Sequence, residues 1–331
     1  MTQHTILDEI YEQCVDLVHR HFPDFPYTGG GFGGPAIHVD FPNEFKHFKK
    51  TDYYFNGELR FVHWTTIEKL CSILNTGEFR LYNLINSEDP NEFYYAANLL
   101  DLNDNLKDWI KDNYFTISFC KMQDLNNKYL WNKYGREYQG VAIEFSIVNH
   151  LDNWERFYIS NVYYELPSSF SEFNNEWKNL KARYQDSISL EYDIWKLAGF
   201  HKQNHYKNEN EVRIATFFPF RNYEEKLKYS RKEFRIDGKL NRIVTYVPLK
   251  LWINFQDSHY PYSFYDQEAA NVYPEEYLHM PHIKIENVYF GYKCGIGKNE
   301  FLDYRKEIQE IIHFQLGYRI DMAYNLFGPV E

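Results

Sequence analysis

The sequence predicts an α+β fold with mixed or antiparallel sheets and flanking helices. Strand-like runs and amphipathic helical runs alternate irregularly, without the βαβ rhythm of a doubly wound parallel sheet. The composition, with 44% hydrophobic and 25% charged residues over 331 positions, is typical of a globular protein with a sizeable core. No apolar run approaches the roughly 20 residues that cross a bilayer, so we expect no membrane association.

An amphipathic helix is expected over residues 5–21, where apolar residues recur at helical spacing. The glycine-rich stretch 27–35 lacks the Lys-Ser/Thr pair of a phosphate loop and is interpreted as a connection. We therefore expect residues 1–55 to form an N-terminal helix and glycine-rich connection. Residues 56–331 are expected to form a single domain with a helical insertion near 169–205.

The larger domain is expected to begin with a strand followed by a helix. Thr65 is a plausible N-cap of this helix, with Glu68 three residues later, and Gly77 ends it. The strands are expected at 59–64, 78–84, 114–120, 141–145, 156–165, 211–218, 242–247, 284–290 and 319–323. The other helices are expected at 93–111, 169–201 and 299–314.

Charge and cysteine usage narrow the function classes. The formal net charge of −11 argues against a non-specific polyanion binder, which needs a dominant basic field. The four cysteines lie far apart, without metal-binding spacing, and the N-terminus lacks the basic and apolar regions of a signal peptide. We expect reduced thiols, no metal site and a cytoplasmic location.

Three stretches carry the clearest chemical signal. His63 lies in a strand-like run over 61–65, Ser118 in one over 116–119, and Glu209 and Glu211 in 208–213. A carboxylate beside a sugar stabilises an oxocarbenium-like transition state, and residues two apart on a strand point to the same face. The Glu-x-Glu pair therefore indicates glycosidic chemistry, with Arg213 holding Glu211 ionised.

The chain resembles the bacterial domain-of-unknown-function 2971 family over roughly residues 59–325. The residues that carry this resemblance are His63-Trp64-Thr65, Asp89-Pro90-x-Glu92, Ile117-Ser118-Phe119, Trp131-x-x-Tyr134-Gly135 and Glu209-x-Glu211-x-Arg213. Within it, the opening His-x-Thr segment is similar to that of histidine-type ADP-ribosyltransferases, and the Glu-x-Glu pair to that of their arginine-modifying relatives. This second likeness implies an ADP-ribosyltransferase-like core.

The resemblance implies an NAD-dependent ADP-ribosyltransferase with NAD as its substrate. Glu211 would be the catalytic carboxylate and Glu209 its partner on the acceptor side. The residues expected to bind NAD are His63, Thr65, Ser118, Trp131, Tyr134 and Arg213. The chain departs from the transferase pattern at three points. Arg60 competes with His63 for the first position, and Ser118 lacks the usual Thr-Ser sequel. The segment between the second and third motifs is long and is expected to contain an inserted helix.

Such an enzyme is expected to act as a bacterial toxin or anti-phage defence effector. Its expected partners are NAD, a macromolecular acceptor (protein or nucleic acid) and a defence-system protein. Two alternatives stay open: a metal-dependent nuclease that uses Asp89 and Glu92, and a non-catalytic nucleotide-sensing module. The candidate residues also allow a structural interpretation, with His63 as a satisfied strand-end histidine and the two glutamates on an exposed strand face.

Overall fold

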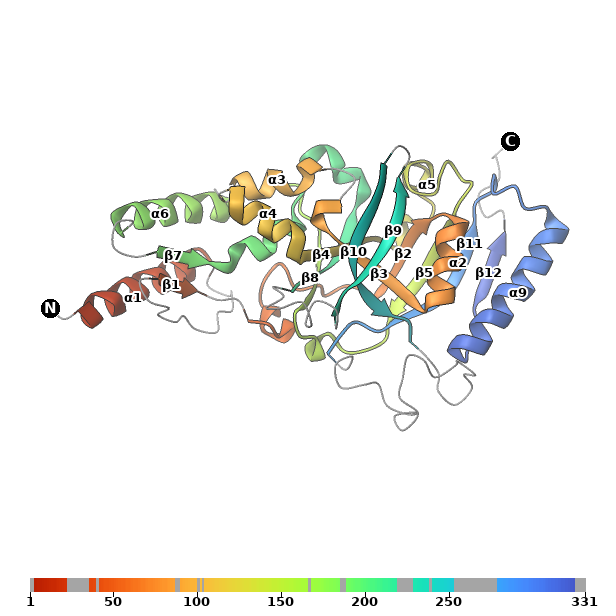
Figure 1. Ribbon diagram of the computed structural model, residues 1–331, viewed down its shortest axis with the longest axis horizontal. Coiled ribbons are helices and arrows are strands. Elements are labelled where there is room, and N and C mark those ends of the chain that lie inside the picture. The colour runs from red at the N-terminus through yellow and green to blue at the C-terminus, as the bar shows by residue number, and fades with distance from the viewer. Residues whose placement is uncertain are drawn as a thin grey trace.

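The computed structural model confirms the α+β class (Figure 1). It describes residues 3–22, 36–39, 42–86, 90–99, 102, 104–165, 168–184, 189–218, 229–237, 240–252 and 279–324. Ten strands join in one mixed sheet, and two more form a small separate sheet. The predicted glycine-rich connection at 27–35 lies outside the described residues.

The large sheet is almost entirely antiparallel. Its strands are β2 (Arg60–Thr65), β3 (Glu78–Asn83), β4 (Tyr114–Lys121), β5 (Val141–Ile147), β6 (Phe157–Asn161), β8 (Glu211–Phe217), β9 (Arg231–Asp237), β10 (Leu240–Lys250), β11 (Ile283–Phe290) and β12 (Asp321–Tyr324). The path runs β12–β11–β5–β2–β4–β3–β10–β9, while β8 and then β6 continue from β4. Only β11 and β12 pair in parallel among these strands, which makes the sheet mixed, as predicted.

The sheet splits at β4. One edge of this strand meets β2, where Val62 lies opposite Cys120, and also meets β3, where Tyr82 lies opposite Thr116. Within the described ladders, residues 117–119 pair with neither strand at this edge, whereas β8 pairs with β4 along its other edge. The split matters for the candidate site because it interrupts the sheet beside Ser118.

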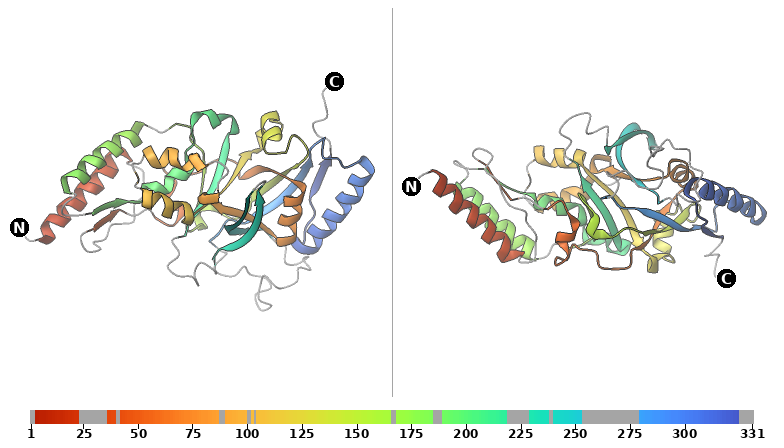
Figure 2. Two further views of the ribbon diagram at one scale, coloured as in Figure 1. Left: turned by 45° about the horizontal axis from the view of Figure 1, so that its top comes forward. Right: turned by 90° about the horizontal axis from the view of Figure 1, so that it is seen from below.

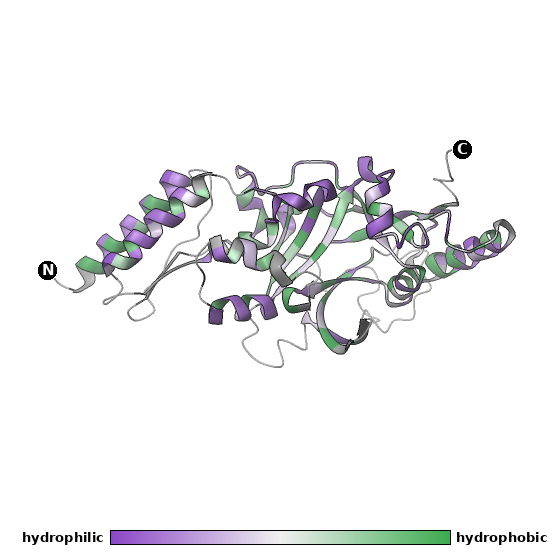
Figure 3. Cartoon of the chain, turned by 90° about the horizontal axis from the view of Figure 1, so that it is seen from above, coloured by the Kyte–Doolittle hydropathy of each residue, from purple (hydrophilic) through white to green (hydrophobic). Residues whose placement is uncertain are grey.

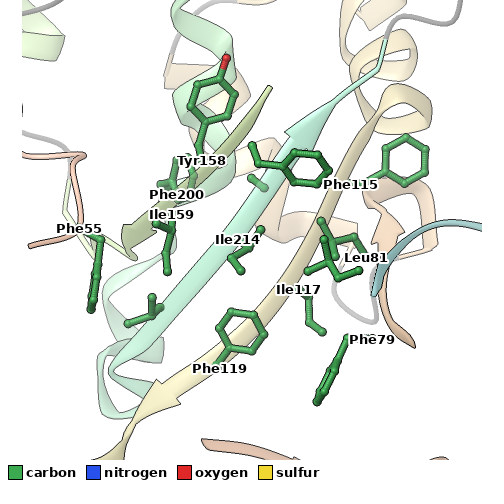
Figure 4. Close-up of a cluster of buried hydrophobic side chains, with 14 of the residues drawn as sticks. Phe55, Phe79, Leu81, Phe115, Ile117, Phe119, Tyr158, Ile159, Phe200 and Ile214 are labelled. Carbon is green, nitrogen blue, oxygen red and sulfur yellow. The ribbon is translucent and has the colours of Figure 1, made fainter. Parts of the chain in front are cut away.

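The two faces of the sheet bury different cores. The larger core includes Phe61, Phe119, Ile143 and Ile214, and Figure 4 shows Ile117, Phe119 and Ile214 projecting from the neighbouring strands β4 and β8. The smaller core, on the opposite face, consists of Val62, Trp64, Cys120, Leu130, Trp131, Tyr138 and Ala142. Because side chains alternate between faces along a strand, each site residue is assigned to one core by its position.

The helices flank the sheet, and several differ from the predicted boundaries. They are α1 (Gln3–His21), α2 (Ile67–Thr76), α3 (Pro90–Leu99), α4 (Asp104–Asn113), α5 (Lys128–Lys133), α6 (Ser168–Tyr184) and α9 (Lys298–Leu316). Thr66, rather than Thr65, caps α2 by accepting a hydrogen bond from the Lys69 backbone amide, and Gly77 ends this helix in the left-handed conformation, as predicted. The single helix predicted at 93–111 is wrong, since two helices occupy this region.

The N-terminal helix and the predicted insertion lie together in space. Helix α1 packs against α6, and β1 (Ala36–Val39) pairs in parallel with β7 (Ser189–Tyr192). These elements project from the body of the sheet (Figure 2), and in Figure 3 hydrophilic and hydrophobic segments alternate along the helices at the end of the molecule marked N. The helix predicted to continue to residue 201 ends at Tyr184, where β7 and the 3-10 helix η5 (Asp193–Phe200) take over.

None of the described helices combines the length and apolar character that crossing a bilayer demands.

Candidate functional site

The antiparallel pair β4–β8 positions most of the predicted site. Ser118 lies opposite Arg213, and Cys120 lies opposite Glu211. Directly opposite residues of an antiparallel pair point to the same face, so these four side chains share one face. Cys120 belongs to the smaller core, which places Ser118, Glu211 and Arg213 on that side of the sheet.

A turn, and not strand alternation, brings Glu209 and Glu211 together. Glu209 ends the 3-10 helix η6 (Asn204–Glu209), and Asn210 takes the left-handed conformation at φ 45°, so β8 begins only at Glu211. Asn tolerates this conformation because its short amide bonds locally, and here it donates to Asp124 Oδ2 at 2.7 Å. The prediction that both carboxylates lie on one strand is therefore wrong.

Lys202 bridges the two carboxylates. Its Nζ lies 2.9 Å from Glu209 Oε2 and 2.5 Å from Glu211 Oε2. All three residues are buried, with exposed fractions of 6% for Lys202, 2% for Glu209 and 4% for Glu211. Since desolvation of buried charges is offset only by close pairing and hydrogen bonds, the three groups form one electrostatic unit. The prediction of an exposed glutamate face is excluded by this burial.

Two further cations complete the cluster. Arg213 donates to Glu211 Oε1 from Nε at 2.9 Å, and its Nη2 lies 2.7 Å from the same oxygen. On the other carboxylate, Glu209 Oε1 accepts hydrogen bonds from Lys133 Nζ at 2.5 Å and from the Tyr134 hydroxyl at 2.6 Å. Three cations thus face two carboxylates, and the cluster carries a formal charge of +1.

The surroundings hold both carboxylates ionised. Burial by itself raises the pKa of Glu211, but the charges of Arg213 and Lys202 and the hydrogen bond from Ser118 hold it well below its ordinary value of 4.5. Burial also raises the pKa of Glu209, but the neighbouring lysines and the tyrosine hydroxyl lower it further, so the pKa of Glu209 lies below its ordinary value. Glu209 and Glu211 are therefore both ionised at neutral pH, within a cluster whose formal charge is +1.

His63 lies on the opposite face of the sheet from these carboxylates. It is two residues from Phe61, whose ring belongs to the larger core, and its own ring contacts those of Phe79 and Phe119. Its Nδ1 donates to the Ser118 carbonyl oxygen at 3.2 Å, at the split in the sheet. Desolvation lowers the pKa of His63 to about 4, so the ring is neutral. The structure thus does not place the His63 and Ser118 side chains on one face.

Thr65 and Trp131 also lie apart from the carboxylates. Thr65 is buried two residues beyond His63 and therefore points to the same face as that histidine. Trp131 is fully buried, donates from Nε1 to the Leu125 carbonyl at 2.7 Å and stacks on Tyr138. It lies in the smaller core and offers no free face on which a base can stack.

Arg60 and Glu144 form a second polar group on the carboxylate face. Arg60 is two residues from Val62, and Val62 lies opposite both Cys120 and Glu144. Glu144 is fully buried, pairs with the partly exposed Arg60, and accepts hydrogen bonds from Asn287 and Tyr289. Arg60, the competitor of His63 in the sequence, thus shares the face of Glu211.

Sequence reasoning missed Lys202 and Lys133. No local pattern marks Lys202, because its role depends on a backbone path that returns it to Glu209 and Glu211. Lys133 does carry a signal, since it lies between Trp131 and Tyr134 in a segment already identified as significant.

The residues proposed for metal-dependent cleavage give no assembled site in the described part of the chain. Asp89 lies outside the described residues, and the side chain of Glu92 does as well. Among the described residues, no group of three or more His, Cys, Asp or Glu is placed to hold a metal ion.

Residues 130–214 match the family model described as "Protein of unknown function (DUF2971)". The resemblance predicted from the sequence is confirmed for these residues, and the matched segment contains the whole Lys133, Lys202, Glu209, Glu211 and Arg213 cluster. Searches among curated proteins and among solved structures found no match.

His201, next to Lys202, is expected to make the fold sensitive to acid. It is 1% exposed and contacts the Tyr53 hydroxyl through Nε2 at 2.8 Å, and desolvation lowers its pKa from 6.5 to about 4. Between these pH values the unfolded chain binds a proton that folded His201 does not. The free energy of unfolding therefore falls as the pH drops from 6.5 to 4, by up to about 3 kcal/mol from this group.

Urea unfolding of His201→Gln across this pH range checks the expectation. The variant should lose less stability in acid than the wild type, whereas the exposed control His313→Gln should follow the wild type. Equal acid sensitivity of His201→Gln and the wild type would show that His201 does not titrate in this way.

Proposed function

We propose that the chain is an NAD-dependent ADP-ribosyltransferase with Glu211 as its catalytic carboxylate. The observation that carries the proposal is the Lys202-bridged pair of Glu209 and Glu211 beside Ser118 on the adjacent strand. Cleavage of the bond between nicotinamide and ribose develops positive charge on the sugar. A fixed, ionised carboxylate beside that charge stabilises the transition state without needing to reorganise.

The groups around Glu211 suit the rest of an anionic dinucleotide. Arg213 and Lys133 supply cations of the kind that bind a diphosphate. Tyr134 is 37% exposed beside them and offers an aromatic face for a base or nicotinamide ring. In the proposed reaction Glu209, ionised and joined to Glu211 through Lys202, would orient the acceptor.

We assign the first position of the motif set to Arg60 in place of His63. Arg60 lies on the face of Glu211, and its partner Glu144 occupies the same cross-strand row as Glu211. With three strand spacings of about 4.8 Å between them, the two glutamates lie roughly 14 Å apart, a span comparable with an extended dinucleotide. His63 then has a structural role at the split.

We further propose a macromolecular acceptor, either protein or nucleic acid, and a role as a bacterial toxin or anti-phage defence effector. Modifying a macromolecule of the cell is the expected activity of an effector of this kind.

NAD turnover by the purified chain tests the proposal. With labelled NAD, with and without cell lysate as a source of acceptors, the wild type should release nicotinamide. Arg60→Ala should lower kcat/KM about tenfold or more, the effect of losing one charge-assisted hydrogen bond, while His63→Ala should retain activity if it folds. The melting temperature of each variant controls for misfolding.

Other outcomes favour other functions. NAD binding without turnover would favour the nucleotide-sensing module, and divalent-metal-dependent cleavage of nucleic acid would favour the nuclease. Turnover lost in His63→Ala but kept in Arg60→Ala would reverse the assignment of the first position.

A further inference from the structure

The ammonium group of Lys133 is enclosed by aromatic rings and a carboxylate. Its Nζ lies 5.1 Å from the ring centroids of both Tyr134 and Tyr206 and 5.6 Å from that of Tyr129. The Tyr129 hydroxyl accepts a hydrogen bond from it at 3.3 Å, and Glu209 Oε1 accepts another at 2.5 Å. Electron-rich aromatic rings around a carboxylate are the chemistry that recognises organic cations. We call Tyr129, Tyr134, Tyr206 and Glu209 the tyrosine cage.

Of the three cations in the cluster, Lys133 is the most readily displaced. Its side chain is 37% exposed, compared with 8% for Lys202 and 4% for Arg213. A partly exposed ion pair contributes at most about 1 kcal/mol, and lysine has a long, flexible stem. The cage also reaches the surface, since Tyr129 is 40% and Tyr134 37% exposed. Lys133 can therefore swing into solvent while the inner cations stay in place.

We propose that Lys133 is the internal occupant of a cation-binding site, and that the tyrosine cage binds an external organic monocation when Lys133 leaves. Exchanging one monocation for another preserves the charge balance of the cluster, which makes the exchange electrostatically neutral. The inference rests on the proposed function only for the source of the cation. In the proposed ADP-ribosyl transfer, the external cation is either the pyridinium ring of the nicotinamide or a guanidinium or ammonium group of a polypeptide acceptor.

Emptying the cage tests the inference directly. Lys133→Ala removes the tethered competitor from the full-length chain. Isothermal titration calorimetry with 1-methylnicotinamide, a pyridinium cation, and separately with methylguanidinium should show binding at least about tenfold tighter than to the wild type, because a tethered group competes at millimolar or higher effective concentration. The matched control Lys128→Ala removes an exposed lysine from the same helix and should bind like the wild type.

A second variant shows whether the rings hold the cation. Adding Tyr206→Ala to Lys133→Ala should abolish the gain in affinity, provided that both variants retain a cooperative thermal transition. A gain for the pyridinium alone assigns the cage to the nicotinamide side, and a gain for guanidinium alone assigns it to the acceptor side. No gain for either cation, or a gain that survives Tyr206→Ala, would overturn the inference.

These measurements contain no NAD and no turnover. Cation binding in a chain that never cleaves NAD would leave the tyrosine cage intact and reject only the proposed function. NAD cleavage without cation binding would reject the tyrosine cage and leave the proposed function standing.

Discussion

Replacing Lys202 by Met is expected to lower the free energy of unfolding by about 3–5 kcal/mol, because two buried carboxylates lose the cation they share. Lys202 Nζ is within 2.9 Å of Glu209 and 2.5 Å of Glu211, and its side chain is 8% exposed. Arg213 still pairs with Glu211 in this variant, but no buried cation then contacts both Glu209 and Glu211. Urea unfolding at pH 7 measures the effect.

The matched control is Lys133→Met, which removes the partly exposed cation from the same Glu209. It should cost about 1 kcal/mol or less, since exposed ion pairs contribute little. The loss in Lys202→Met should also be smaller at pH 4 than at pH 7. Without the charge of Lys202 the pKa of each carboxylate is lowered less than in the wild type, so protonation removes the unpaired charge at a higher pH. Equal losses in both variants would show that burial does not set the importance of Lys202.

Glu211→Gln is expected to lower NAD cleavage by about 10²–10³-fold in the folded protein, and also to lower the free energy of unfolding, because Lys202 and Arg213 then share one buried carboxylate fewer. Gln keeps the shape of the side chain but removes the negative charge that stabilises the developing sugar cation. Nicotinamide release in single-turnover experiments measures this effect, and circular dichroism confirms folding. Unchanged release by a folded Glu211→Gln variant would exclude Glu211 as the catalytic carboxylate.

Glu209→Gln is the matched comparison, because the same charge is removed from the same cluster. We expect nicotinamide release to water to stay within about tenfold of the wild type, while transfer to an acceptor falls much further, since the proposed role of Glu209 is to assist the acceptor. A loss of release as large as in Glu211→Gln would mean that the two carboxylates act as one unit. The ratio of transfer to release in the two variants separates these roles.

The strands that carry the candidate site were predictable because their signal is local. Runs such as 116–119 alternate apolar and polar residues, and the observed β4 includes that run, with Ser118 on it. The single helix predicted at 93–111 missed the break between α3 and α4 for the opposite reason, since apolar periodicity alone does not mark that break. Likewise, the strand β7 follows α6 within a stretch whose periodicity favours a helix.

The grouping of the site residues was only partly predictable. The sequence predicts His63, Ser118 and Glu211 on three separate strands, as observed, but the face on which each side chain lies depends on register. A shift of one residue in register would move each side chain of a strand to the other face of the sheet. In the observed register Arg60, and not His63, lies on the face of Glu211.

By itself the sequence determined the α+β class, the resemblance of residues 130–214 to DUF2971 and the strand that begins at Glu211. Only the tertiary structure decided that this pair is buried and bridged by Lys202. Periodicity and capping are encoded in neighbouring residues, so they can be read along the chain. Burial and charge pairing depend on which segments meet in the folded chain. Lys202 reaches Glu209 and Glu211 only through the backbone path of η6, and Lys133 reaches Glu209 from 76 residues away.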